Sequence, residues 1–244
     1  MSNSLVVIPT YNEADNLPVI AQAIMLLTDP AVDLLIVDDN SPDGTGQIAD
    51  NLSRQYPDRI HVMHRPGKSG LGRAYIEGFQ WALSRKYEAV AQMDADLSHD
   101  PAALKGMFEA AKQSEVVLGS RYLNGVSVIN WPLRRILLSR AANEYVRIVL
   151  GLSIHDITSG FRVYQTTALR RINLVTISSN GYSFQVEMTY RAILSGCTLA
   201  EHAIIFTERR SGQSKMSRGV ILESAIVPWK LRLHSGQLKR LLNK

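Results

Sequence analysis

Short apolar runs of strand length alternate with longer segments through the first half of this 244-residue chain. The runs cover residues 4–8, 32–37, 60–63 and 88–92, and each is followed by a segment long enough for one helix. Strands that alternate with helices favour a mostly parallel sheet, because each helix carries the chain back across one face of the sheet. The sequence therefore predicts an α/β fold, a Rossmann-like sheet with flanking helices.

Paired carboxylates follow two of these expected strands. Asp38 and Asp39 come directly after the second run, and Asp94 and Asp96 come after the fourth. In open α/β sheets, ligands bind at the carboxyl ends of the strands. A single Asp-x-Asp is too short to indicate a site and is more typical of a solvated surface turn, but the repetition at the same end of the sheet favours a functional site.

Charge is divided unevenly between the two halves of the chain. Residues 1–120 hold 9 Lys/Arg and 16 Asp/Glu, a net −7, whereas residues 121–244 hold 18 Lys/Arg and 6 Asp/Glu, a net +12. This asymmetry predicts that the second half faces an anion such as a phosphate, a nucleic acid or a lipid headgroup. The alternative is that its basic helices are simply solvated.

The sequence shows few signs of an extracellular or membrane-spanning protein. Cys197 is the only cysteine, so a disulfide framework and a cysteine-based zinc site are excluded and a reducing compartment fits best. The first apolar run begins within a few residues of Met1, so we expect no signal peptide. No stretch of about 18 apolar residues is present, so we expect no transmembrane helix.

The basic second half contains two segments that suit a membrane surface. Residues 133–150 place apolar side chains at helical spacing among several arginines, and residues 220–233 are apolar with a break expected near Pro228. Ordinary core packing is an alternative for both segments. A last strand is expected at residues 203–206. We expect a single domain at residues 1–217 and a C-terminal amphipathic, basic extension at residues 218–244.

Seven short motifs follow one another over about residues 5–217. They are VIPTYNE (7–13), VDDNSPDGT (37–45), MDADLSH (93–99), GSRY (119–122), TSGFR (158–162), GYSFQ (181–185) and ERR through SK (208–215). With these motifs the chain resembles the family 2 glycosyltransferases of GT-A fold. The early motifs mark the broad family, and the later ones are similar to its dolichol- or polyprenol-phosphate mannose synthases.

The resemblance implies a site for a nucleotide sugar and a metal. Asp94 and Asp96 would hold a divalent ion, Mg²⁺ or Mn²⁺, which stabilises the diphosphate leaving group. Some relatives have glutamine where Ser98 stands, which leaves metal ligation by Ser98 open, and packing is an alternative role for Tyr11. The residues implied in donor binding are Pro9, Tyr11, Glu13, Val37, Asp39, Asp94, Ala95, Asp96, Arg121, Arg209 and Lys215.

The resemblance also implies a site for the phosphate of the acceptor. Arg135 matches the family position, with Arg134 and Ser159 as further candidates, and the pattern does not decide between Arg134 and Arg135 or between Arg209 and Arg210. Asp96, Arg121 and Arg135 are the expected catalytic residues. A phosphate ester has a second pKa near 6, so the acceptor is already anionic at neutral pH and a catalytic base is not required.

The implied reaction is metal-dependent, inverting transfer of mannose from GDP-mannose to a polyprenyl or dolichyl monophosphate. The alternative is a family 2 transferase that uses a UDP-sugar, glucosyl or N-acetylglucosaminyl, with a prenyl phosphate acceptor. We expect a peripheral enzyme at the cytoplasmic face of a membrane, with a membrane-anchoring partner subunit as a further candidate contact. A nucleic-acid partner is not expected, because a protein that binds nucleic acid would have no use for two pairs of carboxylates at strand ends.

Overall fold

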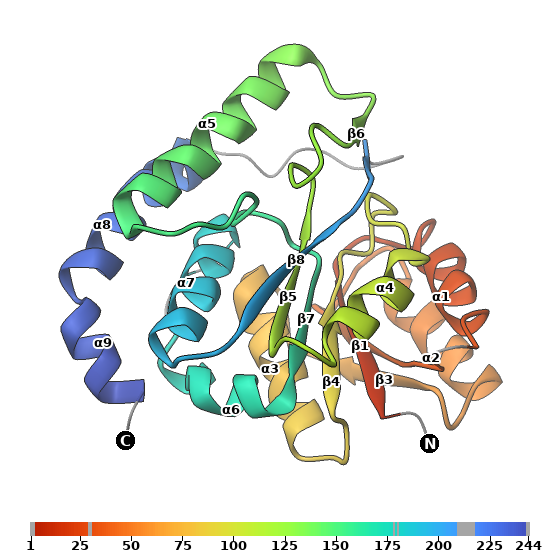
Figure 1. Ribbon diagram of the computed structural model, residues 1–244. Coiled ribbons are helices and arrows are strands. Elements are labelled where there is room, and N and C mark those ends of the chain that lie inside the picture. Colours follow the sequence, from red (N-terminus) through yellow and green to blue (C-terminus); the bar gives the residue numbers. More distant parts are fainter. Residues whose placement is uncertain (1–2, 29–30, 178, 180, 209–217, 243–244) are drawn as a thin grey trace.

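The computed structural model describes residues 3–28, 31–177, 179, 181–208 and 218–242, and for residues 218–222 it describes the backbone alone. Its centre is a seven-stranded sheet in the order β3-β2-β1-β4-β7-β5-β8 (Figure 1). The strands are β1 (Ser4–Thr10), β2 (Asp33–Asp38), β3 (Ile60–His64), β4 (Ala89–Gln92), β5 (Val116–Ser120), β7 (Arg162–Gln165) and β8 (Leu199–Ala203). Within this sheet β7 runs antiparallel to β4 and β5, and the other pairs are parallel. The predicted α/β, mostly parallel fold is confirmed.

Alternation along the strands gives the sheet two buried faces, each covered by helices. Val6 and Ile8 of β1 lie in one apolar cluster, and Leu5 and Val7 lie in the other. The first face is covered by α1 (Leu17–Met25), α2 (Thr45–Gln55) and α4 (Ala103–Ala110), and the second by α3 (Leu71–Leu83), α6 (Thr166–Ile172) and α7 (Gly181–Leu194).

Helix α3 lies unusually close to β1. A Cβ atom at Gly78 would lie 2.5 Å from Cγ1 of Val7, a distance that side chains do not tolerate, so only glycine permits this approach. One helical turn earlier, the same helix carries the buried Tyr75. The close approach therefore holds Tyr75 beneath the end of β4.

The second half of the chain adds a helical layer beside the sheet. Helix α5 (Leu133–Leu150), α7, α8 (Arg218–Leu233) and α9 (Ser235–Leu242) lie together on one side of the molecule (Figure 1). Leu231 of α8 is buried in the same apolar cluster as Val146 of α5, so the C-terminal segment packs into the core. The division at residue 217 stays a prediction. Among the described residues, no helix combines the length and apolar character needed to cross a bilayer.

Two predicted elements are wrong. The expected strand at residues 203–206 is replaced by β8, which ends at Ala203, and by the short β9 (Phe206–Thr207). The apolar run at residues 203–206 was misleading, because Ile205 is 58% exposed. The strand lies earlier and includes the polar Glu201, whose carboxylate accepts the backbone N–H groups of His155 and Asp156 in a neighbouring loop. The expected break at Pro228 is absent, since α8 continues through it to Leu233. A proline removes one backbone donor and crowds the preceding turn, but Val227 before it and Leu231 after it pack against the apolar core.

Candidate active site

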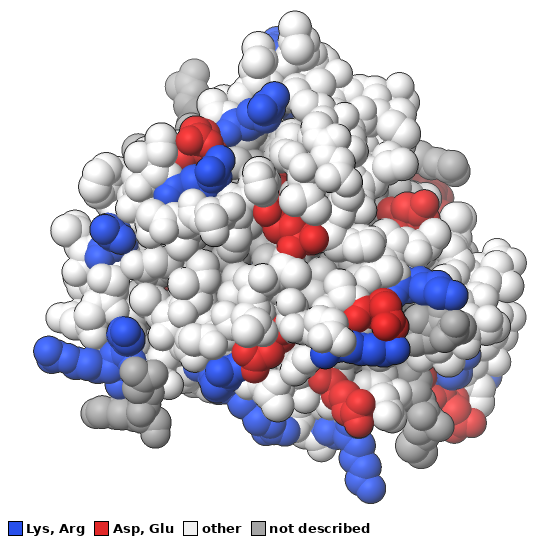
Figure 2. Space-filling model, in the orientation of Figure 1, with Lys and Arg blue, Asp and Glu red and all other residues white. Residues whose placement is uncertain are grey.

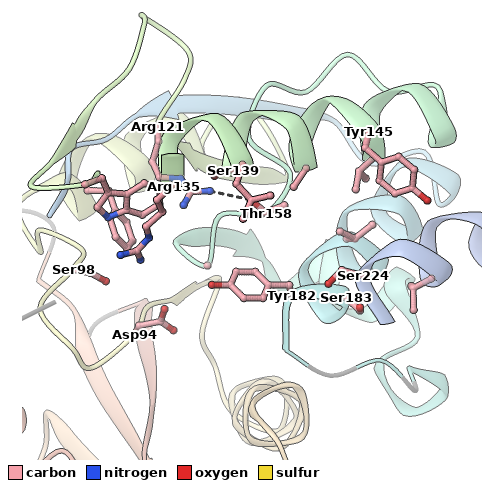
Figure 3. Close-up of a pocket in the computed structure, with 18 of the residues that line it drawn as sticks. Asp94, Ser98, Arg121, Arg135, Ser139, Tyr145, Thr158, Tyr182, Ser183 and Ser224 are labelled. Carbon is pink, nitrogen blue, oxygen red and sulfur yellow. Dashed lines mark hydrogen bonds between the residues drawn. The ribbon is translucent and has the colours of Figure 1, made fainter. Parts of the chain in front are cut away.

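A cavity of about 450 Å³ lies between the loop after β4 and helices α5, α7 and α8 (Figure 3). One end is polar, with Asp94 and Ser98 facing Arg135, and Tyr145 and Ser224 lie at the other end. Its apolar lining is contributed by Leu138, Ala142, Tyr145, Val146, Val186, Ala225, Val227 and Pro228. The cavity therefore joins a charged region at the sheet edge to an apolar region between helices.

The polar end is built on a tight turn directly after β4. Leu97 has a φ of 60°, a conformation that is uncommon for a residue with a side chain. The turn lets Ser98 donate both its N–H and its hydroxyl to Oδ1 of Asp96, at 3.1 and 2.5 Å. Two hydrogen bonds to one carboxylate oxygen fix the orientation of Asp96.

Asp94 is held by two buried rings. The hydroxyl of Tyr75 donates to Oδ1 of Asp94 at 3.0 Å, and the backbone N–H of Asp94 donates to Nδ1 of His99 at 3.4 Å. Burial raises the pKa of Tyr75 well above its ordinary value, and the nearby Asp94 acts in the same direction, so the phenol stays protonated as a donor. Burial also lowers the pKa of His99, so its imidazole is neutral and Nδ1 accepts. His99 thus has a structural role beside Asp94.

The two aspartates fit a hard divalent ion. Mg²⁺ and Mn²⁺ prefer oxygen ligands, and Mg²⁺ commonly takes one or two carboxylates and completes its shell with phosphate and water. The described residues contain no group of three or more acidic, histidine or cysteine side chains that would form an all-protein metal cage. Gly160 leaves room beside Asp94, since a Cβ there would lie 3.3 Å from Oδ2. The donor set therefore suits an ion shared with a phosphate ligand.

Arg121 lines the cavity but is already paired. Its Nε and Nη2 donate to both carboxylate oxygens of Asp156 at 2.6 and 2.7 Å, and Nη2 also donates to Thr158. Burial opposes both charges, yet the attraction outweighs it, raising the pKa of Arg121 and lowering that of Asp156. A phosphate at Arg121 would therefore meet a guanidinium whose orientation is fixed.

The structure distinguishes the two neighbouring arginines of α5. Arg135 lines the cavity, lies over the Trp131 ring at 4.0 Å and forms an ion pair with Glu208, whereas Arg134 is exposed and does not line it. Ser139, one turn after Arg135, also lines the cavity.

The predicted Ser159 does not line the cavity. Its hydroxyl accepts the Phe161 N–H at 3.4 Å, and its side chain is buried. The neighbouring Thr158 lines the cavity instead.

The residues predicted for the nucleotide gather at the same sheet edge, because β1 lies between β2 and β4. Pro9 and Val37 are paired within the sheet, and Ala95 lies between the two aspartates of the β4 loop. The ammonium group of Lys68 lies 4.2 Å from the centre of the Tyr11 ring, and Glu13 accepts the Asn16 side-chain amide.

Asp39 is buried and tied to Arg65. Arg65 pairs with Asp39 and, through Nε at 2.9 Å, with Glu77 of α3. Burial raises the pKa of Asp39, although Arg65 acts in the opposite direction. If Asp39 binds the nucleoside as expected, it does so with a carboxylate whose position is fixed by Arg65. Arg209 and Lys215 lie outside the described residues.

Sequence reasoning did not assign roles to Tyr75, Trp131, Ser139, Asp156 or Glu208. A signal existed for Ser139, which follows Arg135 by four residues on an expected helix and therefore shares its face. Tyr182 belongs to the GYSFQ motif (181–185), whose residues were given no role. Its ring reaches into the cavity from the start of α7 (Figure 3). Tyr75 and Trp131 gave no signal, because an aromatic residue on a helix or loop usually serves packing.

Exposed apolar side chains lie on the outer surface of the helical layer. On α5 they are Leu133, Leu137 and Ile148, and on α8 they include Trp229 and Leu233. Lys and Arg outnumber acidic side chains over α8 and α9 at the left edge of the molecule (Figure 2). This surface combines apolar and basic groups, as expected of a helix at a membrane interface.

Comparisons with known proteins agree on one family. The model of "Glycosyl transferase family 2" matches residues 5–172. The polyprenol monophosphomannose synthase of Mycolicibacterium smegmatis is 48% identical over 240 residues, which are 97% of this chain and 89% of that protein. The undecaprenyl-phosphate mannosyltransferase of Micrococcus luteus is 46% identical over 222 residues, 91% of this chain and 90% of that protein.

Solved structures share the fold at low identity. The glucosyl-3-phosphoglycerate synthase of Mycobacterium tuberculosis, solved with Mn²⁺, UDP and glucosyl-3-phosphoglycerate, has a TM-score of 0.63 and 16% identity. The match covers 95% of this chain and 78% of that one. The expected GT-A-like architecture is confirmed.

Proposed function

Because the chain belongs to glycosyl transferase family 2, we propose that it transfers mannose from GDP-mannose to a polyprenyl or dolichyl monophosphate at a membrane surface. The chain is a glycosyltransferase, and two of its relatives are named as enzymes that attach mannose to a prenyl phosphate. GDP-mannose as donor, dependence on Mg²⁺ or Mn²⁺ and inversion at the anomeric carbon belong to the proposal.

One observation carries the proposal: a single cavity is charged at one end and apolar at the other. A prenyl monophosphate has the same division, with a phosphate head and a hydrocarbon tail. Arg135 suits the phosphate, because a guanidinium fork matches phosphate oxygens, and Leu138 and Val227 suit the tail. A water-soluble acceptor would have no need for the apolar end.

The chemistry asks little of the protein beyond positioning and charge. An oxygen of the acceptor phosphate is already anionic at neutral pH and attacks the anomeric carbon without a base. A divalent ion at Asp94 and Asp96 would neutralise the charge that grows on the departing diphosphate. Direct attack from the face opposite the leaving group inverts the configuration. Tyr75 and Ser98 keep the two aspartates in place during this displacement.

The nucleotide would lie along the ends of β1 and β2, beside Tyr11 and Asp39. The structural neighbour that binds UDP and Mn²⁺ supports a nucleotide-sugar donor and a divalent ion for this fold. A UDP-sugar is the alternative donor, and the two relatives named for mannose transfer favour mannose over it.

The membrane part of the proposal rests on the exposed apolar side chains of α5 and α8. These helices also line the apolar end of the cavity, so a tail that leaves the cavity would enter the lipid beside them. Basic residues on the same helices suit anionic headgroups. That this membrane face is the cytoplasmic one belongs to the same proposal. The same apolar surface suits a membrane-anchoring partner subunit.

The test is a transfer assay with labelled GDP-mannose, a short-chain polyprenyl monophosphate and Mg²⁺ or Mn²⁺. We expect a labelled, phosphate-linked mannolipid that mass spectrometry identifies, and no comparable product from UDP-glucose or UDP-N-acetylglucosamine. Equal or faster transfer from a UDP-sugar would refute the donor assignment and leave the fold unaffected.

A further inference from the structure

Arg135, the residue best placed for an acceptor phosphate, already forms an ion pair with a carboxylate of the same chain. Its Nη1 donates to Oε2 of Glu208, and the two side chains are 33% and 30% exposed. The same guanidinium lies over the Trp131 ring, at 4.0 Å from the ring centre. Glu208 therefore sits where an anionic ligand of Arg135 would bind.

The backbone fixes Glu208 in this position. The short strands β6 (Val128–Ile129) and β9 pair in parallel, and the N–H of Glu208 extends this pairing to the carbonyl of Ile129 at 3.1 Å. Arg135 follows Ile129 by six residues and lies in the first turn of α5. The ion pair thus joins two segments that are distant in sequence and already aligned by the strands.

A chain of packed aromatic rings connects the Arg135–Glu208 pair to the end of the cavity that holds Asp94 and Asp96. Trp131 packs edge-on against Phe206 at 5.2 Å, and Phe206 packs edge-on against His99 at 5.3 Å. His99 in turn accepts the N–H of Asp94. A rigid aromatic wall therefore sets the distance between Arg135 and the aspartates, so the position of the guanidinium matters for transfer.

We propose that Glu208 is a positioning residue that acts through Arg135: it occupies the acceptor-phosphate site at rest and exchanges with the phosphate during each turnover. The inference rests on the proposed function, because it requires that Arg135 receive a lipid monophosphate. A carboxylate is the nearest side-chain equivalent of a phosphate oxygen pair, so it holds the guanidinium in the orientation that a phosphate needs.

The exchange also has a consequence for product release. In the transfer, the bond from the anomeric carbon to the GDP oxygen breaks, GDP keeps the electron pair, and an acceptor phosphate oxygen forms the new bond. The acceptor enters with a charge of about −1.5 to −2, and the diester product carries a single negative charge. Glu208 re-forms its ion pair with Arg135, which lowers the affinity of the site for any phosphate and assists departure of the weaker, singly charged ligand.

The size of the effect follows from the exposure of the pair. Ion pairs that are partly exposed contribute about 0–1 kcal/mol, so competition by Glu208 weakens phosphate binding by up to roughly 5-fold at ~1.4 kcal/mol per decade. The charge-neutral variant Glu208→Gln should therefore bind a prenyl monophosphate about 2- to 5-fold more tightly.

The experiment measures binding of a water-soluble C10 isoprenyl monophosphate, and of its methyl diester as a product mimic, by calorimetry. The proteins are the full-length wild type, Glu208→Gln, Arg135→Gln and the double variant. Glu144→Gln is the matched control, because it neutralises the glutamate of a partly exposed ion pair on α5 with Arg147, outside the cavity lining. Thermal unfolding checks that each variant is folded.

We expect Glu208→Gln to tighten binding of both ligands, the effect to disappear when Arg135 is also replaced, and Glu144→Gln to match the wild type. In the transfer assay, Glu208→Gln should lower the acceptor KM without raising kcat, which a merely structural role would not produce. Weaker or unchanged binding in Glu208→Gln, or tightening that persists without Arg135, would overturn the proposal. If the wild type binds neither ligand, the proposed acceptor itself is wrong, and the inference fails with it.

Discussion

Arg121 and Asp156 form a bidentate ion pair in the wall of the cavity, with nitrogen–oxygen distances of 2.6 and 2.7 Å. The Arg121 side chain is 7% exposed and that of Asp156 is fully buried. The backbone N–H of Arg121 donates to the same carboxylate at 3.0 Å. This pair links the end of β5 to the loop before β7, so it ties together two walls of the site.

Replacing Asp156 with asparagine should destabilise the protein by about 3–5 kcal/mol, because the buried guanidinium loses its counter-charge. Urea unfolding measures this change. Glu144→Gln removes one partner of the partly exposed Glu144–Arg147 pair and should cost less than about 1 kcal/mol. A loss in Asp156→Asn as small as in the control would show that the pair is not needed for stability.

The same pair predicts a dependence of stability on acid. Arg121 lowers the pKa of Asp156 despite the opposing effect of burial. A carboxyl whose folded pKa is depressed stabilises the fold above its unfolded pKa, ~3.9, and that stabilisation is lost as the pH falls through the lower, folded pKa. Unfolding curves of the wild type should therefore lose this contribution below about pH 4, and those of Asp156→Asn should lack it.

Tyr75→Phe should weaken the affinity of the enzyme for its divalent ion, so that transfer needs a higher metal concentration, without unfolding the protein. The substitution removes the hydroxyl that donates to Asp94 at 3.0 Å but keeps the buried ring. Loss of a partner that orients a metal ligand typically costs about 10- to 100-fold in metal affinity or activity. The measurement is the transfer rate against Mg²⁺ or Mn²⁺ concentration. An unchanged metal dependence would show that Tyr75 does not position Asp94.

Arg135→Ala and Arg134→Ala form a matched pair, since both remove one arginine from the first turn of α5. Arg135 lines the cavity and Arg134 does not. A hydrogen bond to a charged group contributes about 1.5–3 kcal/mol, so Arg135→Ala should raise the acceptor KM roughly 10- to 100-fold at ~1.4 kcal/mol per decade. Affinity for GDP-mannose should stay unchanged in both variants. Equal effects of the two substitutions would contradict the assignment.

Ile148→Gln should reduce binding to vesicles that contain anionic lipid. Ile148 is 73% exposed on α5, and burying such a side chain stabilises by about 1.5–3 kcal/mol, which predicts a loss of roughly 10-fold or more in partitioning. Leu26→Gln is the control, because Leu26 is 72% exposed at the end of α1. Equal vesicle binding by the two variants would argue against a membrane contact at α5.

Periodicity predicted β1, β2 and β4 well, because they are short apolar runs buried on both faces. It also predicted the edge strand β3, in which only Ile60 is fully buried. It failed at β8, an edge strand whose residues are only half buried, so that Glu201 looked like part of a loop. It also did not predict α6 and α9. The first follows β7 directly, and the second is only eight residues long with none of them buried.

The candidate site was predictable where residues lie at strand ends. Asp94 and Asp96 are brought to the sheet edge by β4, as their position in the sequence indicated. The partners that orient them were not predictable, since Tyr75 reaches Asp94 only because Gly78 lets α3 approach β1 closely. Likewise Glu208 meets Arg135 through a pairing of two-residue strands that leaves no periodic signal.

Asp96→Ala, assayed for mannose transfer at saturating GDP-mannose and prenyl phosphate, tests the central claim that chemistry takes place at the β4 end of the cavity. Losing a metal ligand should remove several kcal/mol of transition-state stabilisation, at least roughly 100-fold in rate at ~1.4 kcal/mol per decade. Asp100→Ala is the control from the same loop, since Asp100 accepts the Ala102 N–H at 2.9 Å in the turn before α4. Losing this hydrogen bond should cost about 0.5–1.5 kcal/mol of stability and leave the transfer rate unchanged. Near-normal turnover by a folded Asp96→Ala protein would contradict the account.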